Sequence, residues 1–426
     1  MKRGHGSPGV SHRRVSLIDP RWLLVDSMSA KTVGSPFRRG GALILRGRVA
    51  LLTVPMLVVT AACALCPQTP ADTLRRDLLG LVSVGVSGVQ ARVARDDAEW
   101  ADSAGYSDLE TKTPVAPEGY FRIGSLTKTF VAVLVLQLVG EGRLGLDDAV
   151  ERWLPNMVRG NGNDGRTVTV RQLVQHRSGI HDGLPTYDTA DRYLADRYRT
   201  RTPREVVDSA MRYPPDFPPG TDWGYSNTNY LLLGMIIERI TGRPWYAELG
   251  SRILTPLGLR HTIWPGDSPD LPTPHARGYQ QFDADGPLVD VTELIDADAS
   301  GGLVSTSADV GVFLRALMSG RLLGEAQLEE MKRSVPVRAD IQRIWPGARY
   351  GLGLFGVPLS CGGVYWMHNG GQLGFITENG VSDDGHRSAV VSLSTALAVT
   401  EPLERSAAFK AQRGATVLVD HALCGQ

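Results

Sequence analysis

The chain has 426 residues, of which 42% are hydrophobic and 21% are charged, as in an ordinary globular protein. Its 45 Lys and Arg residues balance 45 Asp and Glu residues, and no basic run occurs in the body of the chain. The composition therefore excludes a protein that binds nucleic acid through a cationic surface. The length allows one large domain or two to three ordinary ones.

The first 66 residues differ in composition from the rest. Residues 1–49 are basic and have no hydrophobic period, and an apolar segment follows at 50–65. This segment is as long as the core of an export signal, is short for a membrane span, and ends in small residues that suit cleavage. We expect residues 1–66 to hold a leader and an export signal, with a membrane anchor through 50–65 as the alternative. Because the leader is long, a translation start at Met28 is a further hypothesis.

The four cysteines fall into two groups. Cys63 and Cys66 lie within or just after the apolar segment, and no second pair of ligands accompanies them as a zinc site would require. Cys361 and Cys424 are isolated and late, and we expect them to form a disulfide, which needs an oxidising compartment. The histidines have no metal-ligand spacing, so we expect no metal and no cofactor.

The first elements after the leader are predicted to be a short helix and a hairpin. The segment from Thr73 to Leu79 has a helical pattern. The segments from Val82 to Ala94 and from Glu99 to Tyr106 alternate like strands, with Arg95-Asp96-Asp97 as the turn between them.

An extended run then leads into Gly124-Ser125-Leu126-Thr127-Lys128, which opens a strongly apolar helix. Ser125 and Lys128 are three residues apart and so lie on one helical face. The free N–H groups at a helix N-terminus favour a developing anion, and an amine this close to a hydroxyl can accept its proton. The pattern predicts a serine nucleophile. The alternative is a capped helix with an exposed lysine, since short motifs also occur by chance.

The middle of the chain is predicted to be mostly helices and loops, and it ends in a second motif. Tyr225-Ser226-Asn227 lies just before an apolar helix at 231–240. A tyrosine hydroxyl can shuttle a proton when nearby cations lower its pKa from about 10. An asparagine offers a donor and an acceptor to a substrate amide. The alternative is a turn in which Asn227 caps the helix.

The last quarter of the chain carries a third motif between strand-like runs. The runs are Val364–His368, Leu373–Val381 and Arg387–Ser394, and a helix follows at 401–423. A cationic His368 could lower the pKa of Tyr225 or hold an anionic substrate group, and Gly370 would let substrate approach the backbone. The alternative is an ordinary hairpin turn, which Asn-Gly favours.

The order of elements predicts an α+β fold. Strands near the start and the end of the chain would complete one antiparallel sheet, with helices packed on it. We expect one catalytic domain over 73–426, with a mostly helical inserted lobe at about 145–298.

Taken together, the S-x-x-K at Ser125, the Y-x-N at Tyr225 and the H-x-G at His368 occur in the chain order of the serine penicillin-recognising enzymes. From about residue 73 to the C-terminus, the chain resembles the beta-lactamase-related serine hydrolase family. Within that family it resembles the secreted D-alanyl-D-alanine carboxypeptidases of Streptomyces. Further matching segments are Phe121-Arg122-Ile123, His176-Arg177-Ser178-Gly179, Leu317-Met318-Ser319-Gly320, Tyr350-Gly351-Leu352-Gly353-Leu354 and Leu359-Ser360-Cys361-Gly362.

The resemblance implies a serine beta-lactamase or penicillin-binding-protein fold and a role for each motif residue. Ser125 would be acylated, with Lys128 as its base or proton shuttle. Tyr225 would act as general acid and base. Asn227 would hold the substrate amide, and His368, Asn369 and Gly370 would line the strand beside the substrate.

The same likeness implies that an oxyanion hole would combine the Ser125 N–H with one from 372–374. It also implies the disulfide between Cys361 and Cys424.

The chain departs from the family where substrate is selected. Asn369 replaces a Thr or Ser, Gly371 replaces a Thr of the carboxypeptidases, and no Lys or Arg occurs from Tyr350 to His386. Losing a charged partner for a substrate carboxylate costs on the order of 2 kcal/mol.

We expect a secreted, monomeric serine hydrolase of the D-alanyl-D-alanine carboxypeptidase type, acting on a small peptide. An esterase or a class C beta-lactamase-like hydrolase, acting on an ester or a beta-lactam, is the first alternative. A non-catalytic penicillin-binding sensor is the second.

Overall fold

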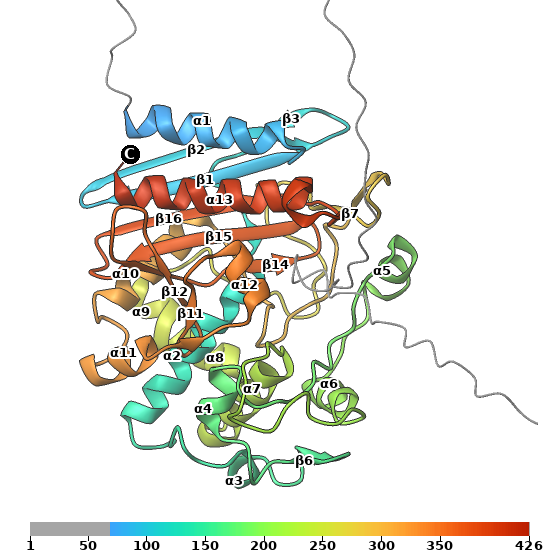
Figure 1. Cartoon of the computed structure of the whole chain (residues 1–426), viewed down its shortest axis with the longest axis vertical. Coiled ribbons are helices and arrows are strands. Elements are labelled where there is room, and N and C mark those ends of the chain that lie inside the picture. The colour runs from blue at the N-terminus through green and yellow to red at the C-terminus, as the bar shows by residue number, and fades with distance from the viewer. Residues whose placement is uncertain (1–68, 426) are drawn as a thin grey trace, which may run out of the picture.

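The computed structural model describes residues 69–425, so the predicted export signal or anchor, with Cys63 and Cys66, lies outside the described residues. Within 69–425 no helix is long and apolar enough to cross a membrane. The described chain is built around one large antiparallel sheet, with helices on both of its faces (Figure 1).

Both ends of the described chain contribute strands to this sheet. The strand order is β10-β11-β12-β13-β15-β16-β1-β2-β3, and β14 also pairs with β15. β1 pairs with β2 on one side and with β16 on the other, with Val89 opposite Leu393. The strands are β1 (Gly88–Arg95), β2 (Ala98–Asp108), β3 (Thr113–Pro114), β10 (Val335–Pro336), β11 (Arg349–Tyr350), β12 (Phe355–Pro358), β13 (Val364–Met367), β14 (Gly370–Gln372), β15 (Phe375–Ser382) and β16 (Arg387–Leu393). The predicted completion of the sheet by both chain ends is confirmed.

Helices cover the two faces of the sheet with different cores. α1 (Pro70–Ser83) and α13 (Ala407–Cys424) lie side by side across one face and bury one apolar cluster there (Figure 1). α10 (Ser307–Met318) packs on the opposite face. α2 (Thr127–Gly140) lies beyond it in the larger apolar cluster, with almost every side chain buried. The S-x-x-K motif at Ser125 is thus anchored in the larger of the apolar clusters.

α1 is longer than the sequence predicts. Thr69 and Asp72 form a capping box that starts the helix at its first proline. The helix continues past Val82, where the sequence pattern predicts a strand, because the spacing of buried leucines continues the helical face. The chain turns at Gly85, whose φ of 107° suits glycine, and β1 begins only after it.

The helices of the segment between α2 and α10 lie mainly beyond the β11–β12 side of the sheet, on the side away from β2 and β3 (Figure 1). These helices are α3 (Val150–Trp153), α4 (Val170–Val174), α5 (Ala190–Asp196), α6 (Pro203–Ala210), α7 (Thr228–Thr241), α8 (Trp245–Leu249) and α9 (Thr255–Leu257). α7 is central, because it packs against α2, α4, α6 and α8. Long loops and short strands connect this segment to β9 (Val304–Ser305), which pairs with β4 (Phe121–Arg122).

Cys361 and Cys424 form the predicted disulfide, with 5.8 Å between their Cα atoms. The bond joins the turn between β12 and β13 to the last residue of α13. It therefore ties the terminal helix to the sheet face that it covers.

A buried carboxyl group also joins α13 to the sheet. Glu378 on β15 is fully buried and accepts hydrogen bonds from Trp345 Nε1–H at 2.9 Å and from Gln412 Nε2–H at 2.6 Å. The hydroxyl of Thr416 donates a third bond at 3.3 Å. Burial outweighs these bonds and raises the pKa of Glu378 from 4.5 to about 7.

This raised pKa predicts a pH-dependent stability. The folded protein binds the Glu378 proton more tightly than the unfolded chain does, so the free energy of unfolding should fall between pH 4.5 and pH 7. The fall should be on the order of 3 kcal/mol. The variant Glu378→Gln should lack this part of the slope in urea unfolding measured at several pH values. The exposed Glu329→Gln is the matched control and should retain it; an equal slope in both variants would contradict the assignment.

Candidate active site

The serine motif enters α2 through a short 3₁₀ turn, Gly124–Leu126. Ser125 and Lys128 lie on the same side of the turn and are both buried, Lys128 completely. Neither end of this turn carries a side-chain cap. The alternative of a capped helix with an exposed lysine is therefore wrong.

Two polar groups converge on the serine oxygen. Lys128 Nζ donates to Ser125 Oγ at 3.0 Å, and the Tyr225 hydroxyl donates to the same oxygen at 2.8 Å. Lys128 also lies 4.7 Å from the centre of the Tyr225 ring, where an ammonium group is attracted by the π face. The three residues thus form one contact group in which a proton can move between neighbouring atoms.

The ammonium group of Lys128 has three hydrogen-bond acceptors. Besides Ser125 Oγ, they are Asn227 Oδ1 at 2.8 Å and the carbonyl oxygen of Ser300 at 2.7 Å. An ammonium has three donors, so these contacts match its capacity and fix its direction. The carbonyl of Ser300 is itself held in place, because Asp298 Oδ1 accepts from the Ser300 N–H and hydroxyl, each at 2.6 Å.

Asn227 joins the lysine to a carboxylate. It occupies the residue before α7, but its side chain makes no cap bond. Instead, its Nδ2 donates to Asp182 Oδ2 at 2.6 Å while its Oδ1 accepts from Lys128. Because a carboxylate only accepts and an ammonium only donates, these two partners fix the orientation of the amide. The capping alternative for Asn227 is therefore wrong.

The His176 ring packs against the Tyr225 ring and is neutral. The two rings stack with centroids 4.1 Å apart. His176 Nδ1 accepts from the Ser226 N–H at 3.3 Å, which puts the ring proton on Nε2. Burial, with Lys128 nearby, holds the pKa of His176 far below its usual value. The ring therefore positions Tyr225 without adding charge.

His368 is also neutral, which corrects the cation expected from the sequence. Burial, reinforced by Lys128, lowers the pKa of His368 to about 3. Its Nδ1 lies 2.7 Å from the Asn369 carbonyl oxygen, so that nitrogen carries the proton, and its Nε2 accepts from the Tyr350 hydroxyl at 3.2 Å. His368 packs 6.4 Å from Tyr225, centroid to centroid. The His368 ring fills space beside Tyr225 but offers no positive charge to a substrate anion.

Asn369-Gly370 does not form the predicted hairpin turn. β13 and β14 both pair with β15, and the register of pairing is the same for both strands. The pairing is interrupted only around His368, which lies opposite Asn379. Asn379 replaces the ladder bonds with its side chain: its Oδ1 accepts from the His368 N–H at 3.3 Å and its Nδ2 donates to the His368 carbonyl at 2.6 Å. The turn lies later, at Gly374, where φ is 72°. The Oδ1 of Asn369 is buried and has no hydrogen-bond partner among the described residues.

β14 lies directly against the serine turn. A Cβ atom on Gly124 would come within 2.8 Å of the Gly371 carbonyl oxygen, and one on Gly370 would come within 1.9 Å of the Ile123 carbonyl oxygen. In the antiparallel ladder with β15, Gly370 and Gln372 form the hydrogen-bonded pairs that flank the turn, so the Gly371 N–H points away from β15. The Gly371 backbone thus adjoins Gly124, the residue before Ser125, whereas the Gly374 N–H donates to Gln280 Oε1 at 3.4 Å.

The sequence identified Ser125, Lys128, Tyr225 and Asn227, and the structure brings these four into direct contact. His368, Asn369 and Gly370 form the adjoining strand segment. Sequence reasoning missed the residues that hold the four in place: Asp182, Asp298 and Ser300. No motif marks them, since each acts through a contact between distant segments. No group of His, Cys, Asp and Glu able to hold a metal occurs within residues 69–425.

A buried serine in contact with a lysine and a tyrosine defines an active-site serine hydrolase. The beta-lactamase family model matches residues 74–414, and the chain belongs to that family.

Solved structures similar to this chain cover nearly all of the described residues. A D-stereospecific amidohydrolase from Streptomyces sp. is 37% identical, with a TM-score of 0.73 over 84% of this chain and 100% of that one. The D-amino acid amidase of Ochrobactrum anthropi SV3 complexed with D-phenylalanine is 28% identical, with a TM-score of 0.70 over 83% of this chain and 98% of that one.

Among curated proteins, penicillin-binding protein 4 of Amycolatopsis lactamdurans is 37% identical over 155 residues, which are 36% of this chain and 38% of that protein. Protein flp of Staphylococcus aureus (strain MW2) is 31% identical over 160 residues, which are 38% of this chain and 31% of that protein. The chain thus spans about a third of the length of the curated relatives that it matches.

The close contact of β14 with the serine turn makes a testable prediction. In Gly370→Ala the new methyl group must push β14 away from Ile123, which would move the Gly371 N–H relative to Ser125. A shift of about 1 Å at a catalytic group can cost on the order of 100-fold, so kcat/KM should fall by that amount. Gly301→Ala is the control, because its Cβ would lie 3.8 Å from the nearest atom, on Gly124. Equal activity of the two variants would refute this role for β14.

Proposed function

We propose that the protein hydrolyses small amides of D-amino acids through an acyl-enzyme at Ser125. The observation that carries the proposal is the convergence of Lys128 Nζ and the Tyr225 hydroxyl on Ser125 Oγ, at 3.0 and 2.8 Å. The similarity to a D-stereospecific amidohydrolase and to a D-amino acid amidase supports the substrate class.

In the proposed reaction, Tyr225 acts as the phenolate, which the Lys128 ammonium beside its ring stabilises; Ser125 Oγ attacks the amide carbon and its proton passes to the Tyr225 oxygen. The N–H groups of Ser125 and Gly371 stabilise the oxyanion. Tyr225 then protonates the leaving nitrogen, the amine departs, and the acyl group remains on Ser125 as an ester. Water adds to the ester carbon and gives a proton to Tyr225. The carboxylic acid leaves as the Ser125 hydroxyl regains its proton.

The charges around the site favour a substrate with a free amino group. Asp182 places a carboxylate one amide away from Lys128. His368 is neutral above pH 3, and the chain has no Lys or Arg from 350 to 386. Arg122 is close in sequence to Ser125 but is buried, and its Nη2 donates to the carbonyls of Pro269 and Thr292 at 2.6 and 3.1 Å. A substrate ammonium group would therefore be better stabilised than a terminal carboxylate.

A D-alanyl-D-alanine carboxypeptidase is the second candidate. It is supported by the order of the three motifs and by the similarity to penicillin-binding protein 4. The Nδ2 of Asn369 would then donate to the terminal carboxylate in place of the hydroxyl that related carboxypeptidases offer. The esterase and beta-lactamase alternatives use the same acyl-enzyme.

We also propose that the protein works outside the cytoplasm and as a monomer. The disulfide between Cys361 and Cys424 supports an oxidising compartment.

An acyl-enzyme at Ser125 predicts covalent labelling. Wild-type protein incubated with a fluorescent penicillin should gain the mass of one penicillin, and Ser125→Ala should gain none, as measured by intact mass spectrometry. Equal labelling of the two proteins would reject Ser125 as the nucleophile. A stable label on a wild-type protein that turns over no amide would instead favour the penicillin-binding sensor.

The proposed ammonium site predicts a difference between two substrate classes. The wild-type kcat/KM should be at least about tenfold higher for D-alanine p-nitroanilide than for its N-acetyl derivative or for an N-acetylated D-alanyl-D-alanine peptide. In Asp182→Asn this preference should disappear, whatever the absolute rates. The exposed Asp191→Asn is the control and should keep it. A wild-type preference for the peptide would favour the carboxypeptidase.

A further inference from the structure

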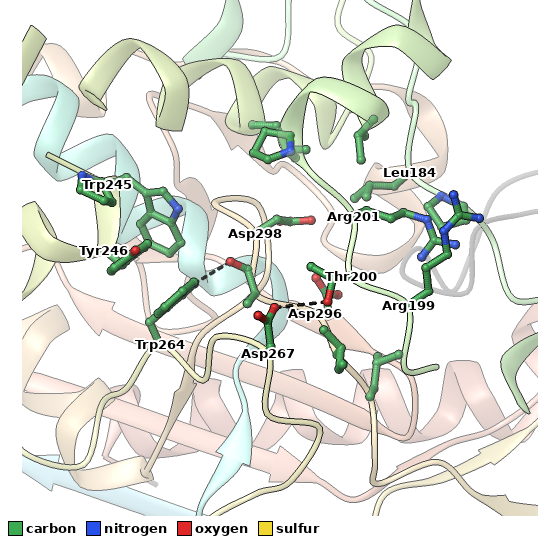
Figure 2. Close-up of a pocket in the computed structure, with 18 of the residues that line it drawn as sticks. Leu184, Arg199, Thr200, Arg201, Trp245, Tyr246, Trp264, Asp267, Asp296 and Asp298 are labelled. Carbon is green, nitrogen blue, oxygen red and sulfur yellow. Dashed lines mark hydrogen bonds between the residues drawn. The ribbon is translucent and has the colours of Figure 1, made fainter. Parts of the chain in front are cut away.

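A cavity of about 320 Å³ lies beside the catalytic centre, between α7, α8 and the loops around Thr200 and Asp296 (Figure 2). Ser125 and Tyr225 do not line it. Its volume is that of a small ligand site. We call it the α7 groove, because Leu231 and Glu238 of α7 form one wall. Glu238 is seven residues beyond Leu231 on the helix, so the wall is about 10 Å long.

One end of the α7 groove adjoins the catalytic centre. Leu184 lies two residues beyond Asp182, which holds Asn227. Leu231 lies one helical turn beyond Asn227. Asp298 lines the groove and also holds Ser300, whose carbonyl accepts from Lys128. A part of the substrate that extends from the catalytic centre past these residues would enter the groove.

The other end of the groove has a rigid aromatic wall. The rings of Tyr246 and Trp264 stack with centroids 3.7 Å apart and planes 5° apart, and Trp245 meets Tyr246 edge to face (Figure 2). Trp264 Nε1–H donates to the Ala297 carbonyl at 2.6 Å, which locks the indole ring. Such a wall binds flat or extended hydrocarbon groups and attracts cations to its π faces.

The charged side chains in the groove are mainly acidic. Among the described residues that line it, the carboxylates are Glu238, Asp267, Asp296 and Asp298, and the guanidinium groups are Arg199 and Arg201. Arg201 is paired with Asp196, which lies outside the groove. Glu238 and Asp267 are both exposed, and Asp267 Oδ1 accepts a hydrogen bond from the Thr200 hydroxyl at 3.2 Å. The lining therefore complements a cation.

We propose that the α7 groove binds the cationic side chain of the substrate's acyl residue, a lysine-like or arginine-like D-amino acid. This inference rests on the proposed amidohydrolase function. With the substrate α-amino group near Asp182, the side chain extends past Leu184 and Asp298. Its hydrocarbon part packs on Trp264, and its charged end lies near Glu238 and Asp267. The groove thus selects the substrate without taking part in bond breaking.

The test compares D-arginine p-nitroanilide with D-leucine p-nitroanilide. Wild-type kcat/KM should be at least about tenfold higher for the arginine substrate. The double variant Glu238→Gln/Asp267→Asn should lose this preference, whatever its absolute rate with the leucine substrate. The exposed Glu329→Gln is the matched control and should behave as wild type. A wild type that hydrolyses both substrates equally, or a preference that survives in the double variant, would overturn the inference.

Binding to an inactive protein separates this inference from the proposed function. In Ser125→Ala, calorimetry should show D-arginine amide binding at least about tenfold tighter than D-leucine amide, and the difference should vanish when Glu238 and Asp267 are also changed. This result is expected even if the wild type turns over neither anilide, an outcome that would count against the proposed function alone. Equal binding of the two amides would refute the assignment of the α7 groove as the site of the cationic side chain. Noncompetitive inhibition of D-leucine p-nitroanilide turnover by D-arginine amide would show a separate effector site and would also overturn it.

Discussion

A buried ammonium group at Lys128 is the constraint on which the rest of the site depends. A cation taken out of water is stable only when its donors are satisfied, and this one has acceptors from three distant segments of the chain. Those segments are the turn at Ser125, the start of α7 at Asn227 and the loop at Ser300. Satisfying the lysine therefore brings together the parts of the site, and Lys128 and Tyr225 both meet the serine oxygen as a consequence.

The residues that bind the acceptors of Lys128 explain why the lysine can stay fixed. Asp182 determines which way the Asn227 amide faces, and Asp298 determines where the Ser300 carbonyl points. Both aspartates act through a neighbour and leave the space beside Ser125 free for substrate. The neutral rings of His176 and His368 fill the remaining volume near Tyr225 and add no charge. The charges next to Ser125 thus come from Lys128 and from the carboxylates of Asp182 and Asp298, and the proposed preference for cationic substrates rests on this balance.

The sheet contributes by bringing β14 against the serine turn. Asn379 interrupts the ladder at His368, and the strand resumes in the same register at Gly370. Close approach of the two backbones requires glycine at Gly124 and Gly370, since a methyl group on either would collide with a carbonyl oxygen. Sequence reasoning interpreted Asn369-Gly370 as a turn or as an opening for substrate. The contact shows that Gly370 is needed first for packing.

The sequence alone determined the α+β class and the antiparallel sheet built from both chain ends, and it singled out Ser125, Lys128, Tyr225 and Asn227 as candidate site residues, because local periodicity and short motifs carry that information. It also indicated the pairing of Cys361 with Cys424. The tertiary structure decided what depends on contacts between distant segments. It set the charge state of His368, because burial decides that pKa. It set the partner of Asn227, the place of Gly371 and the α7 groove, because each arises where separate loops meet.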